Sequence, residues 1–486
     1  MTIVPESFQQ RLRRHAERAP DVPALVHAGE SIAYGTLAAE VDALARALAA
    51  ERVGTDALFA LTARDEIDHA LATLALMALG VPQVALGSHD PPAMRARLAS
   101  RVGATAVRGD RPDDAPPGLR WIALGEARRR ARERPHGGDP LPPHSDAAAL
   151  HFTGSGTTGE PKVVAFTERQ LAMHAETHVG CDGRRVLRPA HIEYNNSRRQ
   201  RLYTLWRGAT CVFADDTCRS LRAQCERDRP DWLELSLVHA SDLVAACREE
   251  GPLGDQVNLR VGGARVPHAL RRELIAAASP RLYVSYGTTE TSFVAVADPS
   301  MHDATESVGP PAPHASVGVL RADGAPAAPG EIGEIRLKTP GMASAYVGDA
   351  DATARHFRDG WFLPGDLASL DERGRLSIHG RKDDMMILNG INIFPSEIER
   401  VLEAHPAVAC AAAFAVASDI HGQIPAAAVE LRGGSAATSA ELVAYARARL
   451  GTRAPRRVEI VVSLPRNAQG KVPRREVARL FGERSA

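Results

Sequence analysis

A loop rich in glycine and hydroxyl residues lies between Phe152 and Lys162. It holds four Ser or Thr residues, three glycines and a terminal lysine within eleven residues. Small residues leave backbone N–H groups and hydroxyls free to surround an anion, and the lysine adds a point charge. The loop differs from a Walker A motif because Gly159 is followed by Glu160 and Pro161. The pattern predicts a phosphate-binding loop after a buried strand.

Four later segments carry further groups suited to a nucleotide. Val284 to Glu290 ends in an aromatic residue, a glycine, two threonines and a carboxylate, which can stack on a base and reach phosphate and Mg²⁺. Asp366 follows a glycine turn and can accept hydrogen bonds from vicinal hydroxyls. The remaining two segments run over 380–399 and 465–471.

Lysine is scarce in this chain, so each lysine is informative. It occurs four times among 59 basic residues, at Lys162, Lys338, Lys382 and Lys471. The wide guanidinium fork of arginine cannot replace a compact ammonium where one is needed. Three of the four lysines lie in the glycine-containing segments described above, which favours a chemical role for Lys162 and Lys471.

The order and spacing of these segments resemble the adenylate-forming superfamily, which includes acyl- and aryl-CoA synthetases, adenylation domains of peptide synthetases and beetle luciferase. The resemblance covers nearly the whole chain. It implies nucleotide contacts at Thr153, Ser155, Gly156, Thr157, Thr158, Gly159, Lys162, Gly262, Gly263, Ala264, Tyr286, Gly287, Thr288, Asp366 and Arg381. It implies catalytic roles for Lys471, Thr289, Glu290 and His191, with Glu290 also binding the metal ion.

The resemblance also implies a two-step reaction with ATP and Mg²⁺. A small carboxylic acid attacks the α-phosphate to give acyl-AMP, and a thiol, from CoA or a carrier protein, then displaces AMP. Lys471 can neutralise the developing charge only when a C-terminal lid closes. Asp383 is expected to be the hinge, and Gly390 is expected to leave room for the pantetheine arm.

The expected acid-binding segment, 191–208, is unusually polar. Tyr194, Asn195 and Arg198 are the candidate pocket residues. Asn195 stands near the position where amino-acid-activating relatives have Asp, and a neutral amide cannot balance an α-ammonium. A hydroxylated, aromatic or otherwise polar acid is therefore favoured over a plain α-amino acid. At their spacing, at most one of Arg198, Arg199 and Arg201 should face the pocket, and the others should face solvent.

The histidines near these segments carry less specific signals. His191 could line the tunnel between acid and thiol or be a structural residue. His174 and His178 have the i, i+4 spacing of a metal pair but no third ligand, so we expect them on a solvated helix face.

The elements that position these residues alternate between helix and strand. Helices are expected over 7–17, 34–50 and 66–79, and strands over 24–27, 82–86 and 148–152. The expected fold is α/β: residues 1–382 form a large domain of two α/β sheets plus a small β-barrel, and residues 383–486 form a small, mobile α+β lid.

Composition excludes several classes of protein. The 59 basic and 59 acidic residues give no net charge, so we expect no nucleic-acid and no membrane partner. The N-terminus lacks the apolar stretch of a secretory signal, and six cysteines without a C-x-x-C pair favour a reduced, cytoplasmic protein. Two alternatives remain: an enzyme of this fold with a non-thiol acceptor or a small inorganic oxyacid, and a degenerate relative that binds nucleotide and regulates.

Overall fold

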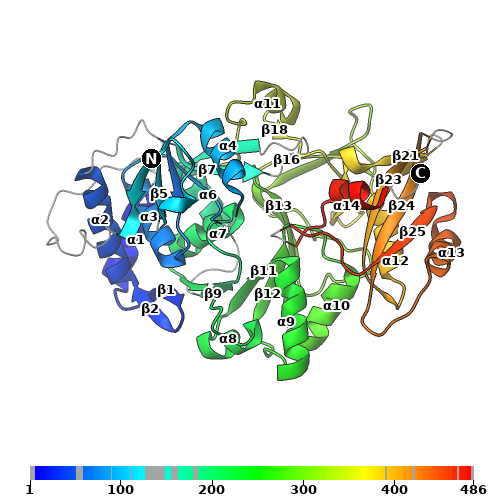
Figure 1. Cartoon of the computed structure of the whole chain (residues 1–486), viewed down its shortest axis with the longest axis horizontal. Coiled ribbons are helices and arrows are strands. Elements are labelled where there is room, and N and C mark those ends of the chain that lie inside the picture. The colour runs from blue at the N-terminus through cyan, green and yellow to red at the C-terminus, as the bar shows by residue number, and fades with distance from the viewer. Residues whose placement is uncertain are drawn as a thin grey trace.

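The computed structural model describes residues 6–50, 58–88, 90–109, 111–125, 148–154, 162–178, 184–388, 391–418, 422–467 and 470–482. Within these ranges the chain forms a large unit of three sheets and a smaller C-terminal unit at the opposite end from α1 (Phe8–Arg18) (Figure 1). The mixed α/β architecture expected from the sequence is confirmed.

The first sheet is mostly parallel and lies at the centre of the molecule. Its strand order is β14-β13-β12-β11-β9-β10-β1-β2. The strands are β1 (Pro23–His27), β2 (Glu30–Ala33), β9 (Arg185–Arg188), β10 (Thr210–Phe213), β11 (Trp232–Leu235), β12 (Asn258–Gly262), β13 (Leu282–Thr288) and β14 (Ser292–Ala297). The ends of β12 and β13 therefore lie side by side, which brings the segments at 262–264 and 286–290 together.

The second sheet carries the start of the glycine-rich loop. Its order is β6-β5-β3-β4-β7-β8. The strands are β3 (Leu58–Thr62), β4 (Gln83–Ala85), β5 (Ala104–Gly109), β6 (Arg120–Ala123), β7 (Ala148–Gly154) and β8 (Lys162–Thr167). Strands β7 and β8 are antiparallel, and Gly154 pairs with Lys162.

Helices fill the space beside these sheets. They are α2 (Tyr34–Ala50), α3 (Glu66–Ala78), α4 (Pro92–Val102), α6 (Glu168–Thr177), α7 (Asn195–Trp206), α8 (Leu221–Asp228), α9 (Leu237–Glu250) and α10 (His268–Ala277), with a short 3₁₀ turn at Pro112–Asp114. Nearly every residue of α3 is buried, because its Ala and Leu residues form one core with α2, α7 and both sheets. Asp65 caps its N-terminus by accepting from the backbone N–H of Asp68.

The third sheet is antiparallel and occupies the range where a small β-barrel was expected. It contains β15 (Ser316–Leu320), β16 (Gly333–Lys338), β17 (Phe357–Arg358), β18 (Trp361–Phe362), β19 (Asp366–Leu370) and β20 (Leu376–Arg381). Helix α11 (Ala350–His356) leads into β17. The 3₁₀ turn Lys382–Asp384 follows β20 and includes the predicted hinge.

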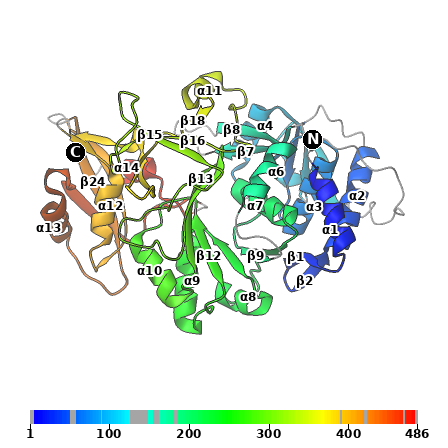
Figure 2. The same cartoon turned by 180° about the vertical axis from the view of Figure 1, so that it is seen from behind.

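The C-terminal unit has its own apolar cores. It consists of β21 (Met386–Leu388), β22 (Ile391–Ile393), α12 (Pro395–Glu403), β23 (Val408–Ser418), β24 (Gly422–Leu431), α13 (Ser439–Leu450), a 3₁₀ turn (Gly451–Arg453), β25 (Arg457–Val461) and α14 (Arg474–Gly482). Figure 2 shows this unit beside α10 and the third sheet. No helix among the described residues is long and apolar enough to cross a membrane.

Candidate active site

Asp366 is the meeting point of three segments that the sequence singled out. The hydroxyl of Tyr286, near the end of β13, donates to Asp366 Oδ2 at 2.7 Å, and Arg381 Nη1 donates to Asp366 Oδ1 at 3.1 Å. Asp366 and Arg381 are register partners across β19 and β20. Burial, and then the nearby Asp366 carboxylate, hold the pKa of Tyr286 well above its usual range. Asp366 is therefore held in place by two donors.

The turn after β13 is tight, and a side chain of α7 holds its backbone by hydrogen bonds. A Cβ at Gly287 would overlap the carbonyl of Ser292, so this β13–β14 hairpin requires glycine. Arg199 on α7 donates from Nη1 to the carbonyl of Thr289 at 2.7 Å and from Nη2 to that of Thr288 at 3.4 Å. Helix α7 thus fixes the turn that carries the predicted phosphate-binding threonine.

Glu290 and Lys162 lie on either side of Tyr346. The Tyr346 hydroxyl donates to Glu290 Oε1 at 2.7 Å, and Lys162 Nζ lies 5.0 Å from the centre of the Tyr346 ring. Desolvation lowers the pKa of Lys162, while the charge of Glu290 raises it. Among the described residues, no group of three His, Cys, Asp or Glu could hold a metal ion. A single carboxylate nevertheless suits Mg²⁺ that arrives with nucleotide phosphates and keeps waters.

His356 is a site residue that the sequence did not reveal. Its Nδ1 lies 2.7 Å from the carbonyl of Leu363 and must donate to it. Its Nε2, 2.7 Å from Lys162 Nζ, is then the acceptor for the ammonium. His356 and Tyr346 belong to no motif, and only the fold brings them to Lys162.

Lys471 is in the C-terminal unit, in a loop that packs against the large unit. Desolvation lowers the pKa of Lys471, and the charge of Asp366 acts in the opposite direction. Gly470 has a φ of 77°, and a Cβ there would overlap the side chain of Val238 on α9. The glycine before the lysine thus allows this loop to pack closely against the large unit.

The phosphate loop is described only at its edges. Asn195 Nδ2 donates to Thr153 Oγ1 at 2.6 Å and to its carbonyl at 3.0 Å, tying α7 to the end of β7. Five predicted residues of that loop lie outside the described residues: Ser155, Gly156, Thr157, Thr158 and Gly159. Gly390 also lies outside them.

The adenine-side segment and the hinge are both described. A Cβ at Gly262 would lie 2.5 Å from Ser285 Oγ, so Gly262 permits close packing of β12 on β13. Gly263 follows with a φ of 85°, and Ala264 comes next. Asp383 is exposed in its 3₁₀ turn, and its role as a hinge stays a prediction.

The expectation that the arginines of α7 outside the pocket face solvent was wrong. Arg198, Arg199 and Arg201 are all buried, at 0%, 5% and 4% exposure. The reason is that α7 packs in the core on several sides, where carboxylate, carbonyl and ring partners replace water. Arg201 pairs with Glu66 at 3.1 Å and lies 4.3 Å from the centre of the Phe213 ring.

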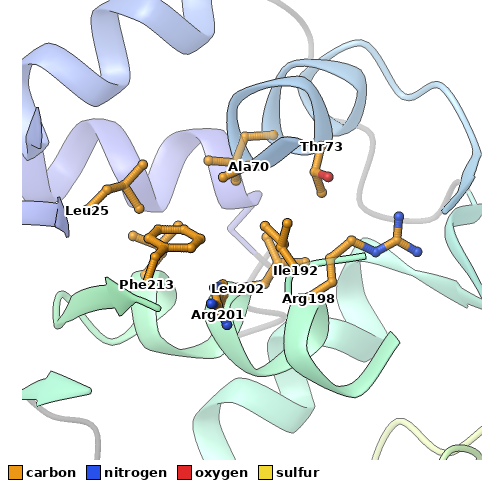
Figure 3. Close-up of a pocket in the computed structure, with 10 residues that line it drawn as sticks. Leu25, Ala70, Thr73, Ile192, Arg198, Arg201, Leu202 and Phe213 are labelled. Atoms are coloured by element: carbon orange, nitrogen blue, oxygen red, sulfur yellow. The ribbon is translucent and has the colours of Figure 1, made fainter. Parts of the chain in front are cut away.

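Arg198 is the most completely buried of the three. Its Nη2 donates weakly to the carbonyl of His151 at 3.4 Å, and its guanidinium lies 5.4 Å from the Phe152 ring centre. Burial lowers the pKa of Arg198 to about 9. Figure 3 shows its guanidinium turned away from a water-sized apolar cavity between α3 and α7, which is too small for an acid substrate.

The histidines differ from expectation in a similar way. His174 and His178 are buried at 2% and 4% exposure, so the prediction of a solvated face was wrong. They lie among aromatic rings, with Tyr203 next to both. His191 is partly buried, with Nε2 2.9 Å from the carbonyl of Arg64 and Nδ1 3.6 Å from Glu193. Its role in a thiol tunnel stays a prediction.

The chain matches two known protein families. Residues 12–347 match the family described as AMP-binding enzyme, and residues 397–471 match the AMP-binding enzyme C-terminal domain. The 2-succinylbenzoate–CoA ligase of Geobacillus kaustophilus is 40% identical over 272 residues, 52% of this chain and 54% of that enzyme. That alignment therefore spans about half of each protein.

Two further relatives extend over nearly the full length. The feruloyl-CoA synthase of an Amycolatopsis species is 30% identical over 510 aligned residues, 96% of this chain and 98% of that enzyme. The solved structure of an amide bond synthetase from Marinactinospora thermotolerans superposes with a TM-score of 0.87 at 25% identity, covering 98% of this chain and 99% of that one.

Proposed function

Because the chain belongs to the AMP-binding enzyme family, we propose that it is an ATP-dependent acid–thiol ligase, which forms acyl-AMP and passes the acyl group to CoA or to the pantetheine of a carrier protein. The observation that carries the proposal is the anchoring of Asp366 by Tyr286 and Arg381. The loop of the C-terminal unit that carries Lys471 packs against Val238 of the large unit through Gly470, so the two units present a held carboxylate and a lysine suited to a nucleotide.

In the first step, the carboxylate oxygen of the acid attacks the α-phosphorus of ATP, and pyrophosphate leaves. Asp366 would accept the ribose hydroxyls, and Lys162 would attract the phosphates. Glu290 would hold Mg²⁺, which neutralises phosphate charge when bound. Lys471 would stabilise the negative charge shared by the attacking carboxylate and the α-phosphate, as a preorganised donor in a partly desolvated site.

The acid is proposed to be polar or aromatic. Support comes from α7, where Asn195 and the buried Arg198 and Arg199 replace the apolar side chains that a fatty-acyl pocket needs. Within the described residues, Arg199 contacts carbonyl oxygens and no carboxylate. A buried cation without a carboxylate favours a substrate that brings oxygen acceptors or negative charge.

In the second step, a thiol attacks the acyl carbon and AMP leaves. The hinge at Asp383 would turn the lid, within proposed domains 1–382 and 383–486, and Gly390 would let the pantetheine arm pass. A second candidate is an amine acceptor, giving an amide, because an amide bond synthetase shares the fold over 98% of this chain at 25% identity. A cytoplasmic location is part of the proposal, supported by free thiols such as Cys225 and Cys247.

The test is acid-dependent exchange of labelled pyrophosphate into ATP across a panel of aryl, hydroxyaryl, dicarboxylic and fatty acids. Exchange with a polar or aromatic acid is the expected result. CoA, a loaded carrier protein and a primary amine are then added separately, and the one that consumes the adenylate identifies the acceptor. The absence of exchange with every acid would contradict the proposal and favour a regulatory nucleotide-binding protein.

A further inference from the structure

A buried charge network joins the two units at a distance from the predicted catalytic residues. Arg265 follows the Gly262–Ala264 segment. It donates from Nε and Nη2 to both carboxylate oxygens of Glu306, at 2.7 and 3.0 Å. Its third nitrogen, Nη1, donates at 2.8 Å to Glu403, the last residue of α12 in the C-terminal unit. The carboxylates of Glu306 and Glu403 are only 5% and 8% exposed.

In the large unit, the backbone at Glu306 is strained. Glu306 has a φ of 56°, a left-handed conformation that a residue with a side chain rarely adopts. Arg271, which is fully buried, holds that conformation by donating to the carbonyls of Glu306 and Ser307 at 3.0 and 2.8 Å. The Glu306 carboxylate also accepts from the N–H of His268 at 2.9 Å. Strain of this kind persists where the surroundings over-determine it, and it gathers at functional positions.

Helix α12 links the network to Lys471. Glu399, one turn before Glu403, accepts from Nη2 and Nε of Arg474 at 2.7 and 2.9 Å. Arg474 stands three residues after Lys471 and also pairs with Asp384, next to the hinge, at 3.2 Å. The orientation of α12 and the position of Lys471 are thus fixed together by one short, rigid helix.

The network can open without leaving an unpaired buried charge behind. When the C-terminal unit turns away, Glu306 also loses its 3.6 Å ion pair with Arg400 of α12. Arg265 keeps both bonds to Glu306, and Glu403 and Arg400 pass into water. The costly event of stranding one partner of a buried ion pair is therefore avoided. A contact that strengthens one orientation and is released cheaply has the properties that a two-position lid needs.

We propose that Arg265, Glu306 and Glu403 form a latch that holds the C-terminal unit in the orientation in which the Lys471 loop packs against α9, and that all three are positioning residues for adenylate formation. The assignment to adenylate formation rests on the function proposed above, whereas the assignment to lid orientation rests on the contacts alone. The latch acts on the first half-reaction and is open during the second.

Glu403→Gln tests the latch, because it removes charge on the lid side and leaves the Arg265–Glu306 pair intact. Pyrophosphate exchange is expected to fall about tenfold, the value of one charge-assisted hydrogen bond. Conversion of pre-made acyl-AMP and thiol to product is expected to stay at the wild-type rate. Hydrogen–deuterium exchange, measured without substrate, is expected to speed up in peptides covering α12.

Glu273→Gln is the matched control. Glu273 on α10 pairs with Arg432 of the C-terminal unit at 3.2 Å, so the same chemical change is made at the same interface. That pair is partly exposed, at 38% and 29%, and its loss is expected to change exchange by less than about twofold. If Glu403→Gln does not fold, Glu403→Asp is used instead. Its shorter side chain keeps the negative charge but moves the carboxylate away from Arg265.

Three results separate the possible failures. Wild-type rates and wild-type deuterium exchange in the Glu403 variant would overturn the latch, as would an equal loss of both half-reactions. If the wild-type protein exchanges pyrophosphate with no acid, the proposed function fails instead. Deuterium exchange then decides the latch alone, with faster exchange of α12 supporting it and unchanged exchange overturning it.

Discussion

At the scale of single residues, the candidate site is a set of charged side chains, each oriented by a neighbour. Asp366 is held by Tyr286 and Arg381, and Glu290 is held by Tyr346. The motif members in these pairs could be predicted from the sequence, because glycine turns and hydroxyl clusters leave a local pattern. Tyr346 could not, because its partner is 56 residues away in the chain and only the fold brings the two together.

Asp366→Asn is expected to weaken ATP and AMP binding about tenfold or more. The amide keeps the shape of the side chain but replaces a charged acceptor, worth ~1.5–3 kcal/mol for a charge-assisted hydrogen bond. Isothermal calorimetry with AMP measures the change in Kd. Tyr286→Phe, which removes a donor to Asp366 and leaves its charge, should cost less. Equal affinity of the Asp366 variant and wild type would place the ribose elsewhere.

His356→Ala is expected to lower pyrophosphate exchange about tenfold, because Lys162 loses the acceptor that fixes its ammonium. The wild-type rate should also decline toward acid pH. Burial keeps the pKa of His356 below 6.5, and once it is protonated it repels Lys162 instead of accepting from it. The alanine variant should lack this component of the pH profile. Identical profiles for the two proteins would show that His356 does not act through Lys162.

At the scale of elements, the sequence predicts positions well where the apolar pattern is long. The expected helices over 34–50 and 66–79 agree with α2 and α3 within one residue. The environment of α7 could not be predicted, because its three arginines look like a solvated face. Their partners, such as Glu66 and Phe213, come from distant segments, and the aliphatic stems pack as apolar groups. Sequence spacing alone cannot identify a helix that is buried on several sides.

Glu66→Gln tests the burial of α7. Glu66 Oε2 accepts from Arg201 at 3.1 Å and from the N–H of Ile192 at 2.9 Å. Neutralising it leaves Arg201 buried without a carboxylate, so the free energy of unfolding is expected to fall by about 3 kcal/mol. Urea denaturation measures the loss, and Glu250→Gln, at an exposed pair with Arg219, is the control. A cost under about 1 kcal/mol would mean that water reaches Arg201.

At the scale of the whole molecule, buried histidines make stability depend on pH. Burial is the main cause that lowers the pKa of His69, His174 and His178 well below 6.5, and it lowers those of His151 and His379 to about 4. The unfolded chain then binds protons that the folded chain does not bind. The free energy of unfolding therefore falls as pH falls from 6.5 toward 4. Glu168, whose pKa burial raises to about 7, opposes this trend with a single proton.

The urea midpoint is therefore expected to fall between pH 7 and pH 5. A histidine such as His151 contributes about 2 kcal/mol of this loss by pH 5. His151→Gln should flatten the dependence, since the amide does not titrate. A midpoint that stays constant over this range would mean that the buried imidazoles are solvated in solution.

Because Lys471 is carried by the C-terminal unit, it is expected to act in only one of the two half-reactions, the one in which that unit is docked on the large unit. The loop that carries Lys471 is held against the large unit, because Gly470 packs on Val238 and Arg265 contacts Glu403 at the end of α12. Lys471→Ala is expected to slow acyl-AMP formation by ~10²–10³-fold, as for the loss of one preorganised charge donor. Conversion of pre-made acyl-AMP to thioester should persist, because that step uses the other lid orientation.

Asp383→Pro should show the reverse pattern. Fixing φ at the hinge hinders rotation, so the first half-reaction should continue and the second should stall. Quenched-flow measurement of adenylate and product resolves both steps in each variant. Equal loss of both steps in Lys471→Ala would make the lysine a general binding or folding residue. The lid would then have a single working orientation. Opposite effects of Lys471→Ala and Asp383→Pro on the two half-reactions distinguish a lid that alternates from one that stays closed.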